Sequence, residues 1–323
     1  MPPMPANAPA IPTTMRAARL AARGGPDQIA IDTVPVPGLG PDDALLAVHA
    51  AAITPSELGW EPTWTRPDGS DRSPITPSHE VAGEIVAVGR GVDGGLIGRR
   101  AFGLTDFYRD GAAAEYVAVR AADLADWPAA LDVLEAAALP LSGLTAWQAL
   151  FDHGRLEPDE RVLIHGAAGG VGSFAVQLAH WRGAHVTALA SAPDHALLKE
   201  LGANVVLDPR SATAALDAAG GMDLVLDSVG GAALEASWRR LSPRGRIVSI
   251  APTSRSIADR DSRGRFFIVA PDRGELVELA DLVEGRLLRV IVERTFSLDE
   301  TRQAYEYGLG EHPRGKVVIQ VRG

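Results

Sequence analysis

The chain of 323 residues contains no cysteine. Disulfide bonds are therefore excluded, and so are metal sites built on thiolate ligands. No stretch approaches the roughly 20 consecutive apolar residues that a membrane-spanning helix needs. The chain has 31 lysines and arginines and 41 aspartates and glutamates, so acidic residues outnumber basic ones. A nucleic-acid-binding domain, by contrast, carries a basic face. We therefore expect neither a membrane protein nor a nucleic-acid partner.

Lysine is nearly absent, because Lys199 and Lys316 are the only two and the other basic residues are arginines. Together with abundant alanine, this bias indicates a high-GC bacterial genome. Residues 1–14 are rich in proline and alanine and lack the basic and apolar regions of a signal peptide. We interpret them as a disordered tail, and with no sign of secretion we expect a cytoplasmic protein.

The first third of the chain is predicted to be rich in β-strands. Short apolar runs alternate with proline and glycine turns; they cover residues 15–20, 29–34, 44–52, 81–88, 99–102 and 114–119. Residues 57–77 show no clear period and hold Trp60 and Trp64, so we expect a long loop there. Residues 131–150 are predicted to be helical, with a break at Pro140.

From residue 160 strands and helices alternate, which is typical of a parallel sheet built from βαβ units. The expected strands are 161–165, 185–189, 205–207, 224–227, 246–250 and 266–269, and the expected helices are 171–182, 194–201, 213–218 and 232–241. The C-terminal part returns to a mixture: helices 274–284 and 299–307 with strands 291–295 and 316–321. The pattern predicts an α/β fold with two domains.

A glycine-rich segment joins the first of these strands to its helix. It reads Gly166-Ala-Ala-Gly169-Gly170-Val171-Gly172. Glycines permit a tight turn and let the backbone approach a pyrophosphate, which the N–H groups at the helix N-terminus then bind. Because further βα units follow at the right spacing, we favour a dinucleotide site over a glycine turn without a ligand.

The choice between NAD and NADP depends on the end of the second strand, where an NAD site normally has a carboxylate for the ribose 2′-hydroxyl. Here that strand ends in Ala190-Ser191, without a carboxylate. Ser191 and Arg210 are candidate partners of a 2′-phosphate, which favours NADPH. Ser191 also fits a helix N-cap, Arg210 a solvated loop charge, and Asp194 lies close enough to serve a ribose.

Several segments, in the right order over residues 15–323, resemble the medium-chain dehydrogenase/reductase superfamily. The glycine segment above has the form found in its quinone oxidoreductase branch. Ser78-His79-Glu80-Val-Ala-Gly83 resembles the "GHE" segment, and Leu141-Ser-Gly143-Leu-Thr145-Ala resembles the "GLTA" segment. Asp227-Ser228-Val-Gly230 is similar to the turn after the fourth strand, and His312-Pro-Arg314-Gly315-Lys316 to the C-terminal "GK" strand.

This resemblance implies a Rossmann doubly wound parallel sheet in residues 136–265 and a GroES-like catalytic domain in residues 15–135 and 266–323. It also implies a homodimer formed through the sheet edge near residues 246–269. Besides the glycine segment, it implies cofactor contacts from further residues: Thr145, Ser228, Phe267, Val269, Arg314, Gly315 and Lys316.

Zinc-dependent members of the superfamily hold their catalytic metal with a Cys/His/Cys set. At the matching positions this chain has Thr54, His79 and the Leu141–Ser142 pair. A single imidazole does not hold zinc where three ligands are usual. We therefore expect no metal, and a structural or pocket role for His79. Quinone oxidoreductases often carry Asn-Pro-x-x-Asp where this chain has Thr54-Pro-Ser-Glu57, which leaves the substrate open.

The reaction that fits these features is hydride transfer from NADPH to a quinone or an α,β-unsaturated carbonyl compound, whose own oxygen takes up the charge. The candidate substrate-pocket residues are Thr54, Glu57, Trp60, His79 and Tyr108, and the proton donor is left open among His79, Tyr108 and Tyr116. Two alternatives remain: a non-redox enzyme such as a cyclase on the same scaffold, and a protein that binds the cofactor only for stability.

Overall fold

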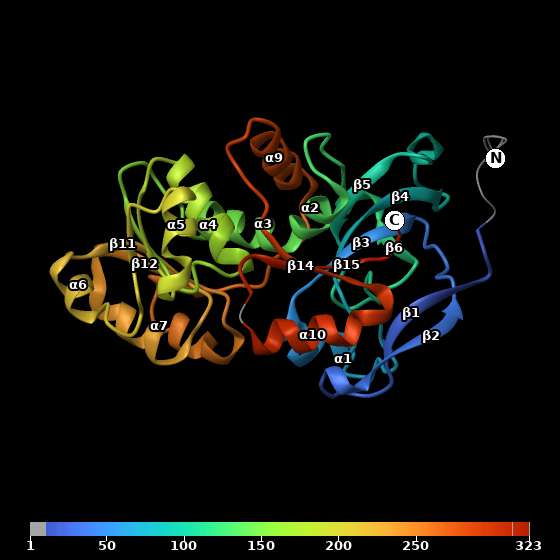
Figure 1. Cartoon of the computed structure of the whole chain (residues 1–323), viewed down its shortest axis with the longest axis horizontal. Coiled ribbons are helices and arrows are strands. Elements are labelled where there is room, and N and C mark those ends of the chain that lie inside the picture. Colours follow the sequence, from blue (N-terminus) through green and yellow to red (C-terminus); the bar gives the residue numbers. More distant parts are fainter. Residues whose placement is uncertain (1–10, 312, 323) are drawn as a thin grey trace. The chain divides into compact units, whose positions relative to one another are not determined.

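The structure is a computed structural model that describes residues 11–311 and 313–322 (Figure 1). The chain divides into two compact units, each built from separate segments. Unit 1 contains the chain up to Leu141, Pro271–Glu284 and the chain from Val292 onward, and unit 2 contains Ser142–Ala270 and Gly285–Ile291. Among the described residues, no helix is both long enough and apolar enough to cross a membrane.

Unit 2 is built on one parallel sheet. Its strands are β8 (Arg161–Ile164), β9 (His185–Leu189), β10 (Val205–Leu207), β11 (Met222–Asp227), β12 (Leu241–Ser249) and β13 (Gly264–Phe266). They lie in the order β10-β9-β8-β11-β12-β13. Counted from β8, this is the order 3-2-1-4-5-6 of a Rossmann sheet. The predicted doubly wound α/β fold is confirmed.

The helices of unit 2 connect these strands. They are α4 (Gly170–Trp181), α5 (His195–Glu200), α6 (Thr213–Ala218), α7 (Gly231–Ser237) and α8 (Arg255–Ala258). Apolar side chains from the sheet and the helices form a common core, among them Leu163, Leu216, Val225, Leu234 and Ala258. The central strands β8 and β11 are almost completely buried, as expected of a parallel sheet built from βαβ units.

Unit 1 is dominated by antiparallel strands. β1 (Thr14–Leu20) and β2 (Ile29–Pro35) form a two-stranded ribbon. A second sheet holds β14 (Val292–Ser297), β15 (Lys316–Gln320), β3 (Asp43–Ile53), β4 (Glu80–Val88), β5 (Arg100–Leu104) and β7 (Leu124–Asp126) in that order, and β6 (Tyr116–Arg120) pairs with β3. This β-rich unit confirms the predicted GroES-like domain.

In the described part of unit 1 the α-helices are α1 (Glu61–Trp64), α2 (Val133–Ala138), α9 (Arg273–Glu284) and α10 (Thr301–Gly310). The carboxylate of Asp132 accepts hydrogen bonds from the backbone N–H groups of Leu134 and Glu135, which fixes the start of α2. α10 packs beside β14 and β15 (Figure 1) and buries Tyr305 completely in the core of the unit. This placement brings a C-terminal side chain to the N-terminal strands.

The predicted break at Pro140 is confirmed, because α2 ends at Ala138 and α3 (Pro140–Trp147) starts with the proline. A π-helix, Gln148–His153, continues α3. The predicted loop at residues 57–77 is partly wrong, since it contains the end of a 3₁₀ helix, Pro55–Gly59, and α1. Each of these short helices has a proline in its first turn, where the missing N–H costs no helical hydrogen bond.

The last strand of the Rossmann sheet is Gly264–Phe266 instead of the predicted 266–269. The Phe267 N–H still donates to the carbonyl of Ser249 at 3.3 Å. Further along, Gln148 binds both backbone groups of Ala270: its Nε2 donates to the carbonyl at 2.9 Å, and its Oε1 accepts from the N–H at 3.1 Å. Gln177 binds Arg289 in the same way, at 3.0 and 2.8 Å. Residues 266–270 and 285–291 therefore lie in unit 2, outside the expected range 136–265.

At the other boundary, residues 136–141 lie in unit 1. Of the tail expected at residues 1–14, the first ten positions lie outside the described residues, and so does His312.

Candidate functional site

The glycine segment of unit 2 forms a tight turn between β8 and α4. Gly166 has a φ of +65°, and a Cβ there would lie 2.4 Å from the Ser228 hydroxyl oxygen. A Cβ on Gly172 would lie 2.2 Å from the carbonyl oxygen of Gly166. The Ser228 hydroxyl donates to the carbonyl of His165 at 3.0 Å, next to the turn. The turn and the close packing of α4 on it therefore both require glycine.

This geometry fits a pyrophosphate group. α4 starts at Gly170, with Gly169 as its N-cap residue. The first N–H groups of a helix have no partner within the helix. Here they belong to Gly170, Val171 and Gly172, and the two glycines place no side chain between the backbone and an anion. The loop also lies at the carboxyl end of the central strand, next to β11, where a Rossmann sheet binds its ligand.

The residues predicted to select NADPH are engaged in local pairs. The Ser191 hydroxyl donates to the carboxylate of Asp194 at 2.8 Å. Arg210 binds Asp208 through two nitrogens, at 3.0 and 2.6 Å, and its side chain is 81% exposed. The hydrogen bonds from Arg210 lower the pKa of Asp208 to about 2, so this carboxylate is ionised. Sequence reasoning missed Asp208, although its position directly after β10 was the available signal.

The other predicted cofactor residues fall into two groups. Thr145 lies buried in α3, Phe267 and Val269 are buried after β13, and the Phe267 ring lies 4.4 Å from that of His153. In unit 1, Arg314 is exposed, whereas Gly315 has a φ of +65° and is buried just before β15.

In unit 1 the structure brings Glu57 into a buried polar cluster. Its side chain is 1% exposed. Oε1 accepts a hydrogen bond from the Tyr305 hydroxyl at 2.6 Å and one from the Thr54 N–H at 3.2 Å, and Oε2 accepts one from the Ser78 N–H at 3.0 Å. Burial raises the pKa of Glu57 to about 7, although these hydrogen bonds oppose the shift. Sequence reasoning missed Tyr305, which no motif connects with Glu57.

His79 lies on the other side of this carboxyl group. Its Nε2 is 3.7 Å from Oε2 of Glu57, and its Nδ1 is 2.8 Å from the Thr105 hydroxyl. The ring is buried and contacts Phe107 edge-on, with 5.1 Å between the ring centroids. Burial lowers the pKa of His79 to about 3, so the imidazole is neutral at physiological pH.

Lys316 forms an ion pair with Glu80 inside unit 1. The two side chains are 4% and 0% exposed. The Lys316 ammonium donates to Oε2 of Glu80 and, at 3.3 Å, to the hydroxyl of Thr54. Oε1 of Glu80 accepts from the N–H of Leu141 at 3.0 Å. Lys316 is thus connected to Thr54, and through it to the Glu57 cluster.

The aromatic candidates are placed differently. Trp60 packs edge-on against Phe107 at 5.4 Å, so it joins the His79 side of the cluster. Tyr108 is 44% exposed. Trp64 is buried and its indole N–H donates to the carbonyl of Leu58 at 2.8 Å, which is ordinary packing. Tyr116 packs against the guanidinium of Arg322.

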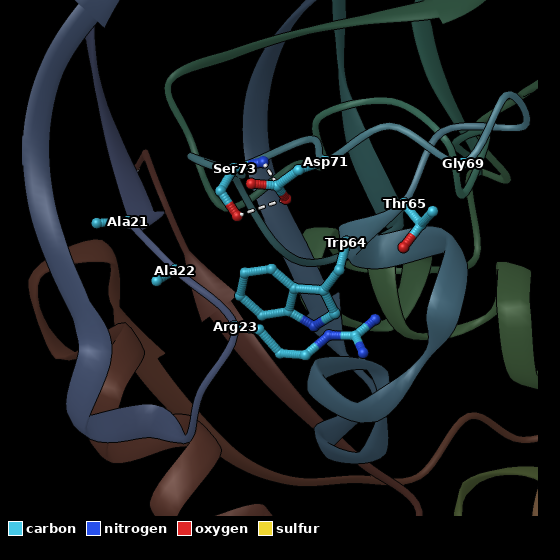
Figure 2. A pocket seen from close by; sticks show the side chains of 8 residues that line it. All are labelled: Ala21, Ala22, Arg23, Trp64, Thr65, Gly69, Asp71 and Ser73. Carbon is cyan, nitrogen blue, oxygen red and sulfur yellow. Dashed lines mark hydrogen bonds between the residues drawn. The ribbon is translucent and has the colours of Figure 1, made fainter.

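A surface pocket of about 370 Å³ lies elsewhere in unit 1 (Figure 2). It is lined by Ala21, Ala22, Arg23, Trp64, Thr65, Gly69, Asp71 and Ser73. Arg23 is paired with Glu61 at 2.7 Å, and Asp71 accepts two hydrogen bonds from Ser73. None of the predicted substrate-pocket residues lines it. The polar groups of this pocket are already engaged, so it is a weaker candidate site than the Glu57 cluster.

No group of three or more His, Cys, Asp or Glu side chains suited to a metal ion occurs in the described part of the chain. At the positions that match the zinc ligands of the superfamily, the Thr54 hydroxyl accepts from Lys316 and His79 is bound to Thr105. The donor set does not fit the three N or S ligands of a catalytic zinc.

Comparisons with known proteins agree with this fold. Residues 40–129 match the alcohol dehydrogenase GroES-like domain family, and residues 201–319 match a family described as zinc-binding dehydrogenase. A chloroplastic quinone oxidoreductase of Triphysaria versicolor is 29% identical over 89% of this chain and 92% of its own. A mitochondrial NAD(P)H oxidoreductase of Danio rerio is 27% identical over 87% of this chain and 84% of its own.

Among solved structures, a quinone oxidoreductase from Coxiella burnetii superimposes with a TM-score of 0.87 at 30% identity and covers 96% of this chain and 100% of its own. The match covers the Rossmann sheet with its glycine turn as well as the β-rich unit. The chain therefore belongs to the medium-chain dehydrogenase/reductase superfamily of oxidoreductases and is similar to its quinone oxidoreductases.

Proposed function

We propose that this protein transfers hydride from NADPH to a quinone or an α,β-unsaturated carbonyl compound, without zinc. The observation that carries the proposal is the turn at Gly166–Gly172, which leaves no room for a Cβ and presents the N-terminus of α4. When bound there, a nicotinamide cofactor supplies the hydride, and the protein has to position the acceptor and exclude water.

NADPH is favoured over NADH by the end of β9. No carboxylate follows that strand, because Ala190 and Ser191 occupy the position. Arg210 is exposed, so its guanidinium can bind a 2′-phosphate in competition with Asp208. The Danio rerio relative is named as an NAD(P)H oxidoreductase, which is consistent with either nicotinamide cofactor.

The acceptor is inferred from what the cluster in unit 1 lacks. The chain has no cysteine, and His79 alone does not supply the three N or S ligands of a catalytic zinc, so the proposed site has no metal-bound group to stabilise an alkoxide. A conjugated carbonyl compound avoids this need because its own oxygen takes up the charge. Two of the relatives are named quinone oxidoreductases, and the aromatic rings of Trp60 and Phe107 suit a planar acceptor.

The cytoplasmic location, the homodimer and the catalytic and cofactor roles of the two domains remain proposals as well. The short edge strand β13 is the element through which we expect the dimer to form.

The test is a panel of quinones and enones with stereospecifically deuterated NADPH. We expect cofactor oxidation with label on a product carbon for an enone, or with matching quinol formation for a quinone. Gly172→Ala serves as the cofactor-site variant, because its Cβ would approach the Gly166 carbonyl to 2.2 Å; it should weaken NADPH binding. A physiological substrate converted without any cofactor oxidation would overturn the redox proposal and favour the non-redox alternative.

A further inference from the structure

Glu57 differs from the other carboxylates of the chain in its surroundings. It comes from the 3₁₀ helix after β3, yet its partners come from distant parts of unit 1: Tyr305 on α10, and Ser78 and His79 just before β4. Lys316 acts on Glu57 through its charge, but its ammonium is bound to Glu80 and Thr54 instead. Among the lysines and arginines that the structure describes, none forms an ion pair with this buried carboxyl group.

The pattern of donors and acceptors leaves one place for a proton. Oε1 of Glu57 already accepts from Tyr305 and Thr54, and Oε2 accepts from Ser78. The remaining direction on Oε2 faces Nε2 of His79 at 3.7 Å. If Nδ1 of His79 donates to the Thr105 hydroxyl, then Nε2 is an acceptor and points its lone pair at this oxygen.

We propose that Glu57 and His79 hold one dissociable proton between Oε2 and Nε2, and that Tyr305 is the positioning residue that orients Glu57 for it. The distance exceeds that of a direct hydrogen bond, so transfer between the two atoms needs an approach of about 0.5–1 Å. His79 also contacts the ring of Phe107, and Phe107 in turn contacts Trp60. His79 therefore connects Glu57 with an aromatic candidate for the substrate pocket.

The titration behaviour of both groups supports this pair. Burial raises the pKa of Glu57 to about 7 and lowers that of His79 to about 3, so the shared proton lies on Glu57 and is lost as the pH rises through about 7. Lys316 and the Tyr305 hydroxyl favour the ionised form of Glu57, and Arg72 disfavours a charged His79. Burial and the neighbouring Glu57 carboxylate raise the pKa of Tyr305 well above its usual value, which keeps the phenol protonated and able to donate.

This proton gives the proposed reaction its second hydrogen, and in this respect the inference rests on the proposed function. Reduction of an enone requires one hydride, which brings two electrons to the β-carbon, and one proton for the α-carbon or the oxygen. Oε2 of Glu57 gives its proton to Nε2 of His79 while Nδ1 gives its own proton to the Thr105 hydroxyl, which passes a proton on to the substrate. Glu57 remains as a carboxylate, and afterwards a proton from water returns along the same route and restores the starting tautomer of His79. Electrons come only from NADPH, so no further reductant is needed.

The first test does not depend on any substrate. Infrared difference spectra of the intact, cofactor-free protein, with carbon-labelled glutamate, follow the C=O band of a protonated carboxylic acid between about pH 5 and 9. We expect one such band to disappear with a midpoint at about 7 and to be missing from Glu57→Gln. Tyr305→Phe should raise the midpoint, because it removes a hydrogen bond that stabilises the carboxylate.

Tyr307→Phe is the matched control: Tyr307 lies on the same helix but packs against Phe296, whereas the phenol bound to Glu57 is that of Tyr305. It should leave the midpoint unchanged. A wild-type protein without a carboxylic acid band at pH 6, or equal midpoints in the two tyrosine variants, would overturn the shared proton. This holds even if Glu57→Gln fails to fold.

The second test separates the two proposals. Once the panel has identified an enone or a quinone that the protein reduces, kcat/KM for this substrate is measured against pH. It should fall about tenfold per pH unit above the infrared midpoint, since one protonated group is required. Tyr305→Phe should move this fall to higher pH together with the band. A correct band with a pH-independent kcat/KM would refute the proton supply alone, whereas a correct band without any NADPH oxidation would refute the proposed function.

Discussion

Replacing Lys316 tests whether the buried ion pair stabilises unit 1. The ammonium is 4% exposed and its partner Glu80 is 0% exposed, so Lys316→Met leaves a buried carboxylate without its cation. Removing one partner of a buried pair costs about 3–5 kcal/mol. Urea unfolding should show this loss as a lower midpoint.

Two variants make the result specific. Lys199 is the only other lysine and is exposed, so Lys199→Met should change the unfolding free energy by no more than about 0.5 kcal/mol. The double variant Lys316→Met with Glu80→Gln should recover more than half of the loss, because a neutral amide oxygen still accepts from Leu141. If Lys316→Met is as stable as Lys199→Met, the reasoning from burial is refuted.

The same variant decides the role that the superfamily resemblance implies for Lys316. A higher Kd for NADPH in the folded Lys316→Met protein would support a place beside the cofactor. An unchanged Kd together with the lost stability would make Lys316 a structural residue that supports Glu80 and Thr54.

Three further predictions concern cofactor choice, pH and metal. Arg210→Ala should weaken NADPH binding more than NADH binding, and Asp208→Asn should strengthen NADPH, because Asp208 competes for the guanidinium; isothermal titration that finds equal effects on both cofactors would place Arg210 outside the site. The pKa of Glu57 is raised from 4.5 in the unfolded chain to about 7, so its contribution to stability is complete below pH 4.5 and is lost as the pH rises through 7. Relative to Glu57→Gln, the wild-type unfolding free energy should therefore fall by about 3 kcal/mol between these limits, and urea titrations with parallel pH curves for the two proteins would contradict it. Finally, the purified protein should contain no stoichiometric zinc and should keep its activity in a chelator, which elemental analysis and assays with EDTA check.

The local features of the sequence determined a large part of this fold. The alternation of strand and helix patterns predicted the Rossmann sheet, because hydrophobic periodicity is set by neighbouring residues. The glycines at 166 and 172 predicted the turn, since a positive φ and a missing Cβ are properties of the residue itself. The proline at 140 likewise marked the start of a helix.

Only the tertiary structure decided which side chains meet. Glu57 and Tyr305 are separated by 248 positions, and Glu80 and Lys316 by 236, so no local pattern relates them. The unit boundaries depend in the same way on Gln148 and Gln177, which hold backbone segments far along the chain. The protonation behaviour of Glu57 also depends on the tertiary structure. From the sequence alone Glu57 is an ordinary carboxylate with a pKa near 4.5, and only its removal from water raises that pKa to about 7.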